Sequence, residues 1–179
     1  MKSTNILCRV CRSARRPARY NGFTLMELLI VMAIIAILML IAIPTVGSLK
    51  KKANDLSAVQ SVHTIINAES MFESNYPTNG FACSIAALGG DPKSGAPSIT
   101  AAQLIQPDLA SGVKSGYQFT ITNCTKVNNG GTDRITGYVI TATPLTVGQS
   151  GDRSFCADQS GIIKFDPAGG TNCSQNLGQ

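Results

Sequence analysis

Apolar side chains form one continuous stretch near the beginning of the chain. Residues 28–43 carry no polar side chain, and Glu27 stands directly before them. Counted from Phe23, a helix over this stretch would extend about 31 Å, which matches the hydrocarbon thickness of a bilayer. The pattern therefore predicts a transmembrane helix over 23–43, and Pro44 would weaken the helix close to its exit from the membrane.

A second helical pattern follows Pro44. Apolar side chains recur at spacings near three and four, at Leu56, Val59, Val62, Ile65, Ile66 and Phe72. Charged and amide side chains fall mostly on other faces, at Lys51, Lys52, Asp55, Gln60, Asn67 and Glu73. This spacing predicts an amphipathic helix over 44–75, which Tyr76-Pro77 would end. We therefore expect one long helix whose second half needs a packing partner.

Loops and strands replace the helical pattern over 76–179, which we expect to form an exported globular domain. Glycines and prolines mark a loop region at 76–112, with a short helix at 98–105. Alternating apolar and polar side chains predict an antiparallel sheet within 117–165, followed by a C-terminal tail. Its strands are expected at 117–122, 137–143, 153–157 and 162–165. The fold class is α+β, a long N-terminal helix packed against a three- or four-stranded antiparallel sheet.

Positive charge is concentrated ahead of the apolar stretch. The formal net charge is +5, and residues 1–22 hold six basic side chains and no acidic one. A basic leader of this kind keeps the N-terminus in the cytoplasm and exports the remainder. The apolar stretch is too long for a secretory signal peptide, so we expect it to be retained. The nearly neutral remainder argues against nucleic acid as a partner, and Lys50-Lys51-Lys52 is expected to face solvent or lipid headgroups.

The six cysteines fall into two groups. Cys8 and Cys11 lie in the leader, where one isolated pair is only a weak metal or redox signal. The exported part contains Cys83, Cys124, Cys156 and Cys173. An oxidising compartment favours two disulfides among these four, and three pairings are possible. We prefer Cys83–Cys124 with Cys156–Cys173, because the two loops are then local and do not interleave.

The exported part contains no catalytic constellation, and we expect no enzyme activity. His63 is the only histidine, and no nucleophile motif accompanies it. No cluster has the spacing of zinc ligands, so we expect neither a metal nor a cofactor. A calcium ion held by Asp152, Asp158 and Asp166 is a weaker alternative, because these residues match no known calcium-loop spacing.

The most specific motif lies where the leader meets the apolar stretch. Gly22 is followed by Phe23-Thr24-Leu25-Met26-Glu27 and then directly by the apolar run. This sequence resembles the signature of type IV prepilins and type II secretion pseudopilins. The resemblance implies that a membrane prepilin peptidase cuts between Gly22 and Phe23 and N-methylates Phe23. It also implies that the exported domain has the type IV pilin fold.

The resemblance assigns further roles within the predicted helix. Glu27 would be the fifth residue of the mature chain, and the family pairs this glutamate with the terminal amine of a neighbouring subunit. Such a pair would neutralise two charges that are each costly in an apolar filament core. Pro44 occupies a position where many members carry a helix-weakening proline. Glu27 and Pro44 are therefore the candidate assembly residues.

These observations leave three functional alternatives. The chain is expected to be a structural subunit of a type IV pilus, or a pseudopilin of a type II secretion system, or a signal-anchored exported binding protein that does not polymerise. In the first two cases its partners are the prepilin peptidase, copies of itself in a helical filament, an inner-membrane assembly platform, and membrane lipid before assembly. The subunit would cross the inner membrane once, with a periplasmic C-terminal domain, and end in an extracellular pilus or a periplasmic pseudopilus.

Overall fold

The computed structural model describes residues 22–177, so all of the predicted leader except Gly22 lies outside the described residues. The contacts divide the chain into two compact units, Met1–Ile41 and Ala42–Gln179. Helix α1 (Leu25–Asn75) begins in the first unit and ends in the second. Its backbone is helical at Pro44, but the side chains of residues 41–45 are not among those described.

In the first unit, α1 has no covering layer. Every described residue from Gly22 to Leu40 is exposed, and the first apolar side chains, Phe23 and Leu25, are 84% and 83% exposed. Over the side chains that the structure describes, no helix has both the length and the hydropathy of a membrane span.

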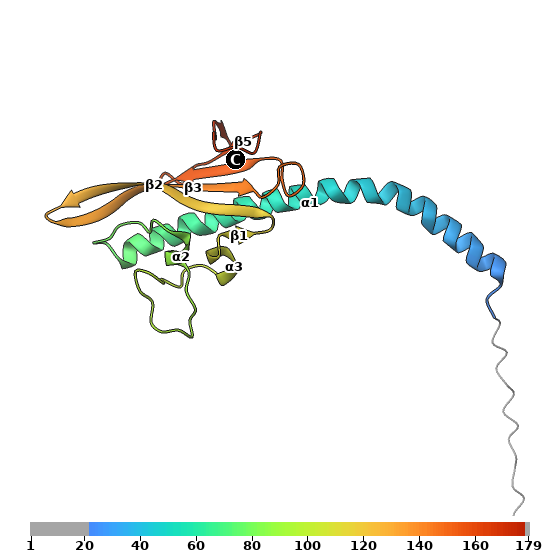
Figure 1. Ribbon diagram of the computed structural model, residues 1–179, viewed down its shortest axis with the longest axis horizontal. Helices are drawn as coiled ribbons and strands as arrows, with labels where there is room; N and C mark the ends of the chain where they lie inside the picture. Colours follow the sequence, from blue (N-terminus) through green and yellow to red (C-terminus); the bar gives the residue numbers. More distant parts are fainter. Residues whose placement is uncertain (1–21, 178–179) are drawn as a thin grey trace, which may run out of the picture. The chain divides into compact units, whose positions relative to one another are not determined.

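The second unit combines the rest of α1 with an antiparallel sheet. Within residues 42–177, six strands lie side by side in chain order: β1 (Val113–Lys114), β2 (Tyr117–Asn129), β3 (Thr132–Pro144), β4 (Ser154–Asp158), β5 (Ile163–Asp166) and β6 (Gln175–Asn176). Figure 1 shows α1 along the sheet, and two short helices, α2 (Ile85–Leu88) and α3 (Pro107–Ala110), contact β2 and β1. The predicted α+β class is confirmed.

The number of strands differs from the prediction of three or four. Strands β2 to β5 overlap the four predicted segments, whereas β1 and β6 have two residues each. Two residues cannot produce a visible alternation of side chains. Both short strands are defined by pairing with a longer neighbour, Val113 with Gln118 and Asn176 with Lys164.

Strands β2 and β3 are longer than predicted. A bulge in β2 hid their full length from the sequence pattern. Regular pairing with β3 stops at Thr122 and resumes at Lys126, with register shifts on both sides of Thr125. Asn123 adopts a φ of 51°, a left-handed conformation that asparagine tolerates better than most residues. The bulge interrupts the alternation that marks a strand in sequence. The hairpin continues beyond it and turns at Gly130 and Gly131, whose φ values are 66° and 99°.

The core lies between the second half of α1 and the sheet. The buried residues of α1 include Asp55, Ala58, Ser61, Val62, Ile65, Ala68, Glu69 and Phe72. The predicted apolar face was therefore partly wrong, because Leu56 is 72% exposed, and Val59 and Ile66 are only partly buried. The prediction counted only large apolar side chains. The buried face also contains Ala58 and Ala68, whose small side chains let the helix lie close to the sheet. The true face is rotated by a fraction of a turn and includes two acids.

The short helix predicted over 98–105 is wrong. Its first residues form a tight turn instead, through two backbone hydrogen bonds between Ser98 and Ala101 (3.0 and 3.1 Å). Gln103 adopts a φ of 57°, which a right-handed helix excludes. The N–H group of Leu104 donates to the last carbonyl of α2 (2.8 Å), which has no partner within that helix. The segment is thus held extended against the end of α2.

Candidate functional site

The start of α1 holds the predicted processing and assembly residues. Gly22, Phe23 and Thr24 precede the helix, and Glu27 lies in its first turn. The Glu27 carboxylate accepts hydrogen bonds from the backbone N–H (3.1 Å) and the hydroxyl (3.0 Å) of Thr24. In return, the Glu27 N–H donates to the Thr24 hydroxyl oxygen (3.2 Å). This reciprocal arrangement is a capping box, which satisfies N–H groups at the start of the helix.

Gly22 has no packing role within the described chain. A Cβ atom added there would meet no described atom within 4 Å, and its φ lies outside the left-handed region. A requirement for glycine at this position would therefore come from a partner that approaches the backbone closely, as a peptidase does. Cleavage after Gly22, methylation of Phe23 and the assembly roles of Glu27 and Pro44 stay predictions.

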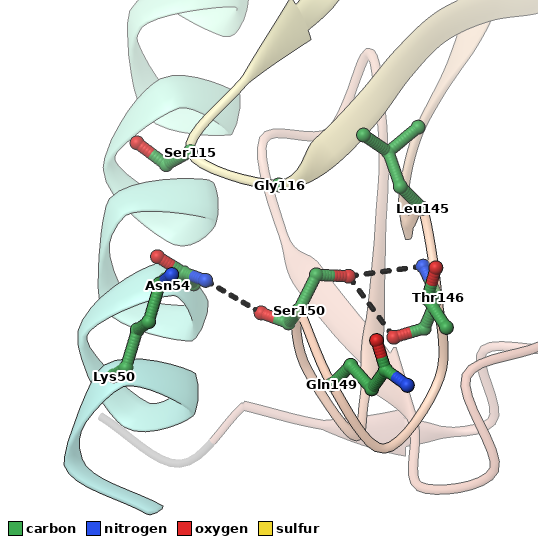
Figure 2. A pocket seen from close by; sticks show the side chains of 8 residues that line it. All are labelled: Lys50, Asn54, Ser115, Gly116, Leu145, Thr146, Gln149 and Ser150. Atoms are coloured by element: carbon green, nitrogen blue, oxygen red, sulfur yellow. Dashed lines mark hydrogen bonds between the residues drawn. The ribbon is translucent and has the colours of Figure 1, made fainter. Parts of the chain in front are cut away.

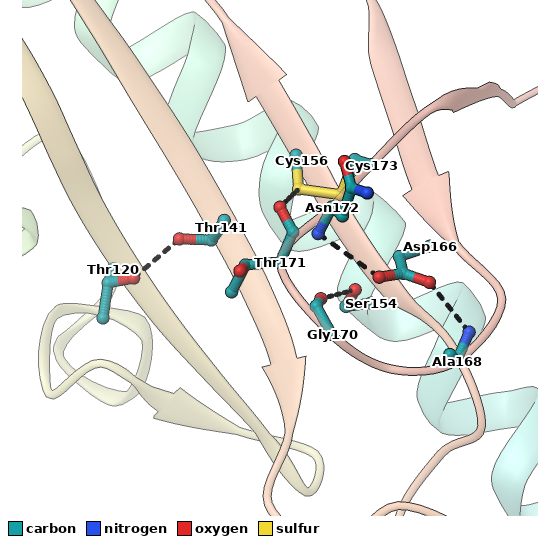
Figure 3. The surroundings of a disulfide bond; sticks show 10 residues. All are labelled: Thr120, Thr141, Ser154, Cys156, Asp166, Ala168, Gly170, Thr171, Asn172 and Cys173. Atoms are coloured by element: carbon teal, nitrogen blue, oxygen red, sulfur yellow. Dashed lines mark hydrogen bonds between the residues drawn. A yellow bond between two sulfur atoms is a disulfide. The ribbon is translucent and has the colours of Figure 1, made fainter.

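The four cysteines of the C-terminal part form two disulfides, Cys83–Cys124 and Cys156–Cys173. This is the pairing preferred from the sequence. Cys83–Cys124 joins the segment that follows α1 to the bulge of β2. In Figure 3, Cys156–Cys173 ties the loop after β5 onto β4, where Ser154 also donates to the Gly170 carbonyl. The leader pair, Cys8 and Cys11, lies outside the described residues.

The three aspartates considered for calcium have separate local partners. Asp152 forms an ion pair with Lys51 (3.0 Å), and Asp158 accepts a hydrogen bond from the N–H of Ser160 (2.8 Å). The hydroxyl and N–H of Ser160 lower the pKa of Asp158. Asp166 accepts hydrogen bonds from two backbone N–H groups of the loop that follows it (2.9 and 3.2 Å). Within residues 22–177, no three His, Cys, Asp or Glu side chains gather into a group that could hold a metal ion.

Sequence reasoning missed two acids on the buried face of α1. Asp55 is 6% exposed, and Glu69 is completely buried. A sequence signal for them existed: positions 55, 58, 62, 65, 69 and 72 alternate at spacings of three and four once Ala58 is counted as apolar. Acids inside such a pattern indicate buried polar contacts, because an unpaired buried charge is costly.

Asp55 connects α1 to two parts of the sheet. The Tyr117 hydroxyl, from the start of β2, donates to Asp55 Oδ1 (2.6 Å) and lies 2.7 Å from the carbonyl oxygen of Arg153. Arg153 Nε donates to the other carboxylate oxygen (3.1 Å), and its guanidinium lies over the rings of Phe155 and Phe165. Burial and the Asp55 carboxylate raise the pKa of Tyr117, so its hydroxyl keeps its proton. Asp55, Tyr117 and Arg153 therefore act as a structural link between α1 and the sheet.

Glu69 lies at the opposite end of the same helix face. One of its carboxyl oxygens, Oε2, accepts a hydrogen bond from the N–H of Ala82 (2.7 Å), whereas Oε1 has no partner among the described residues. Burial raises the pKa of Glu69 from 4.5 to about 8, although the Ala82 N–H acts in the opposite direction. The carboxyl group is therefore mostly protonated at pH 7. Burial and the charge of Glu69 in turn raise the pKa of Tyr138 to about 12.

Comparisons with known proteins bear on the N-terminal segment. Residues 17–43 match the family described as the prokaryotic N-terminal methylation motif. The chain is 42% identical over 53 residues to the "Type IV wide pilus major component PilA4" of Thermus thermophilus. That match covers 30% of this chain and 40% of the relative, so the chain spans less than half of the relative's length. No solved structure matches the chain.

Both comparisons concern the N-terminal segment, and the helix packed on an antiparallel sheet agrees with the type IV pilin fold expected from the sequence. Through its N-terminal segment, the chain is similar to type IV pilins.

Proposed function

We propose that this chain is a structural subunit of a type IV pilus. In this proposal it is made as a prepilin, cut between Gly22 and Phe23 by a prepilin peptidase, and methylated at Phe23. The mature subunit waits in the inner membrane, with its C-terminal domain in the periplasm. An assembly platform in that membrane then adds it to a helical filament made of identical copies.

The observation that carries the proposal is the uncovered apolar start of α1, directly behind the methylation motif. Side chains from Phe23 to Leu40 are exposed, although burial of one large apolar side chain is worth about 1.5–3 kcal/mol. A stretch of this kind needs either lipid or other protein around it. A filament made of copies supplies that cover after the subunit leaves the membrane.

Glu27 supports the same proposal through its position beside the cleavage junction. After cleavage, Phe23 would carry a cationic amine, and the Glu27 carboxylate would be the nearest acid along the chain. The capping box holds this carboxylate at the start of α1, where the helix dipole also favours a negative charge. A neighbouring subunit's amine would then find an oriented acceptor rather than a mobile side chain.

The alternative is a pseudopilin of a type II secretion system, which would use the same helix and the same processing. The similar protein of Thermus thermophilus is a major component of a wide pilus, which favours the pilus. The disulfides suit either filament, because both expose the C-terminal domain to an oxidising compartment.

Filaments isolated from the cell surface test the proposal. Mass spectrometry should identify this chain as a polymer component, and cells without its gene should lose those filaments. Loss of protein secretion with no loss of surface filaments would support the pseudopilin instead. A processed protein that stays monomeric in both compartments would contradict both filament functions and leave the exported binding protein.

A further inference from the structure

A pocket lies in the second unit, between α1, the β1–β2 turn and the loop after β3. Its volume is about 450 Å³, which is within the range of small-ligand sites. Figure 2 shows the lining residues: Lys50 and Asn54 of α1, Ser115 and Gly116 of the turn, and Leu145, Thr146, Gln149 and Ser150 of the loop. No role is yet attached to this pocket, and none of its lining residues takes part in the processing junction.

Close backbone contacts hold the walls of this pocket in place. The Asn54 side-chain amide donates to the Ser150 carbonyl (2.7 Å), and the Ser150 hydroxyl bonds to both the N–H and the carbonyl of Thr146 (3.0 Å each). Gly116 lies so close to Ser150 that an added Cβ would come within 2.8 Å of that side chain. The pocket is therefore preformed, and a ligand would not have to order the loop.

The lining leaves several hydrogen-bonding groups free. Within the described residues, no hydrogen bond or ion pair is formed by the Lys50 ammonium, the Thr146 hydroxyl or the Gln149 side-chain amide. Of the described lining residues, none is acidic. The nearby acid Asp152 already has its charge opposed by Lys51 (3.0 Å). The pocket thus has one uncompensated positive charge and donors from two sides.

This chemistry favours a phosphate over a carboxylate or a neutral sugar. Lysine acts as a point charge with several donors, whereas planar carboxylates are best recognised by the fork of an arginine. Donors from both a helix and a loop suit the spread oxygens of a tetrahedral anion. The lining holds no aromatic ring on which a sugar could stack. The volume also exceeds that of free phosphate and leaves room for a substituent.

We propose that this pocket binds a phosphate group, carried either by a lipid headgroup or by free phosphate. Lys50 follows the end of the apolar run at Ile43 by about two helical turns. A subunit anchored through that run would therefore bring Lys50 to the level of the headgroups. The lipid source rests on the proposed function, whereas binding of free phosphate does not.

Phosphate titrations of the full chain in a phosphate-free, uncharged detergent test the proposal. The NMR signals of the Asn54 and Gln149 side-chain amides should shift and saturate with inorganic phosphate, or with the phosphodiester of short-chain phosphatidylglycerol. Lys50→Gln should weaken binding at least tenfold. The matched control is Lys52→Gln, an exposed lysine outside the pocket, which should change the affinity less than twofold.

The two titrations distinguish the sources. Saturation with the lipid alone assigns the site to a headgroup, saturation with inorganic phosphate alone assigns it to free phosphate, and competition between them assigns it to their shared chemistry. No saturable shift with either ligand, or shifts that persist in Lys50→Gln, would overturn the proposal. Because the titration uses unassembled subunits, failure of filament formation would not produce either of these negative results.

Discussion

The four carboxylates of α1 have different environments, which determine what each can do, and Glu73 forms an ion pair with Arg134 (2.6 Å). Glu27 is exposed and holds the first turn through Thr24. Asp55 is buried between a tyrosine hydroxyl and an arginine. Glu69 is buried with a single backbone donor. Of these four, Glu27 is the one that is exposed and not engaged with another described part of the chain beyond its own first turn, so it can take a partner from another copy.

Two substitutions of Glu27 distinguish its role in the helix cap from the role of its charge. Glu27→Ala should leave cleavage after Gly22 intact but reduce filaments to below detection, since leaving one partner of a buried ion pair unpaired costs about 3–5 kcal/mol. Glu27→Gln keeps an acceptor for the Thr24 N–H and removes only the charge. Filament yield by electron microscopy and cleavage by intact mass would be measured for each variant.

If the ion pair drives assembly, both Glu27 variants fail to polymerise. Full assembly of Glu27→Gln together with failure of Glu27→Ala would assign Glu27 to the helix cap alone. Normal filaments from Glu27→Ala would exclude both roles.

Glu69 should make the stability of the second unit decrease with rising pH. Its pKa is about 8 in the folded chain and near 4.5 in the unfolded chain, so the folded state binds the extra proton between these values. The stabilisation is complete below about pH 4.5 and is lost as the pH rises through 8, by at most about 1.4 kcal/mol per unit. Urea unfolding of the full chain in uncharged detergent at pH 5.5, 7 and 8.5 would measure this slope.

Two variants identify the group responsible for that slope. Glu69→Gln cannot ionise and should flatten the profile. Glu73→Gln, one helical turn further on, removes an acid that pairs with Arg134 (2.6 Å) and should retain the slope. A wild-type profile that is flat, or that rises between pH 5.5 and 8.5, would contradict the protonated state of Glu69.

At the residue scale, sequence reasoning found Glu27 but not the buried acids. Glu27 stood out because a charge next to an apolar run is costly and therefore informative. Asp55 was placed away from the apolar face because acids usually lie in solvent, and Glu69 was not singled out. Their burial depends on partners far along the chain, Tyr117 and Ala82, which no local pattern indicates.

Some elements of the second unit can be predicted from local sequence and others cannot. The long helix and the central strands follow from periodicity, since their side chains face either the core or the solvent in a regular order. Segment 98–105 does not, because its backbone groups are satisfied by the end of α2 rather than by its own turns. The two-residue strands likewise exist only through their neighbours.

The disulfides stabilise elements that have little core of their own. Removing Cys156–Cys173 by a double serine substitution should lower the free energy of unfolding by about 3 kcal/mol, because this bond closes a short loop. Removing Cys83–Cys124 should cost about 1 kcal/mol more, since its sequence separation is 41 rather than 17. Denaturant unfolding of the oxidised full chain in detergent would measure both effects.

If loop entropy governs the stabilisation, removing Cys83–Cys124 must lower the free energy of unfolding more than removing Cys156–Cys173. Equal losses, or a larger loss at Cys156–Cys173, would show that native packing rather than loop closure governs the stabilisation. Reduced wild-type protein is the matched control, because it should lose both contributions without any substitution.

At the scale of the whole molecule, the chain joins an apolar helix start to a disulfide-bonded sheet domain, and the two belong to separate compact units. The first unit exposes its described apolar side chains, whereas the second has a buried core between α1 and the sheet. In the proposed function, the folded domain would stay unchanged while the surroundings of the helix change from lipid to protein. This division is the physical basis of the proposed filament function.

The most direct test of that function is the N-terminal peptide mass of the polymerised protein. Filaments from wild-type cells should yield a chain that begins at N-methylated Phe23. Gly22→Asp should keep its leader and stay out of filaments, although a Cβ at Gly22 disturbs no described neighbour. Polymer that retains the leader, or that begins at any other residue, would contradict the account.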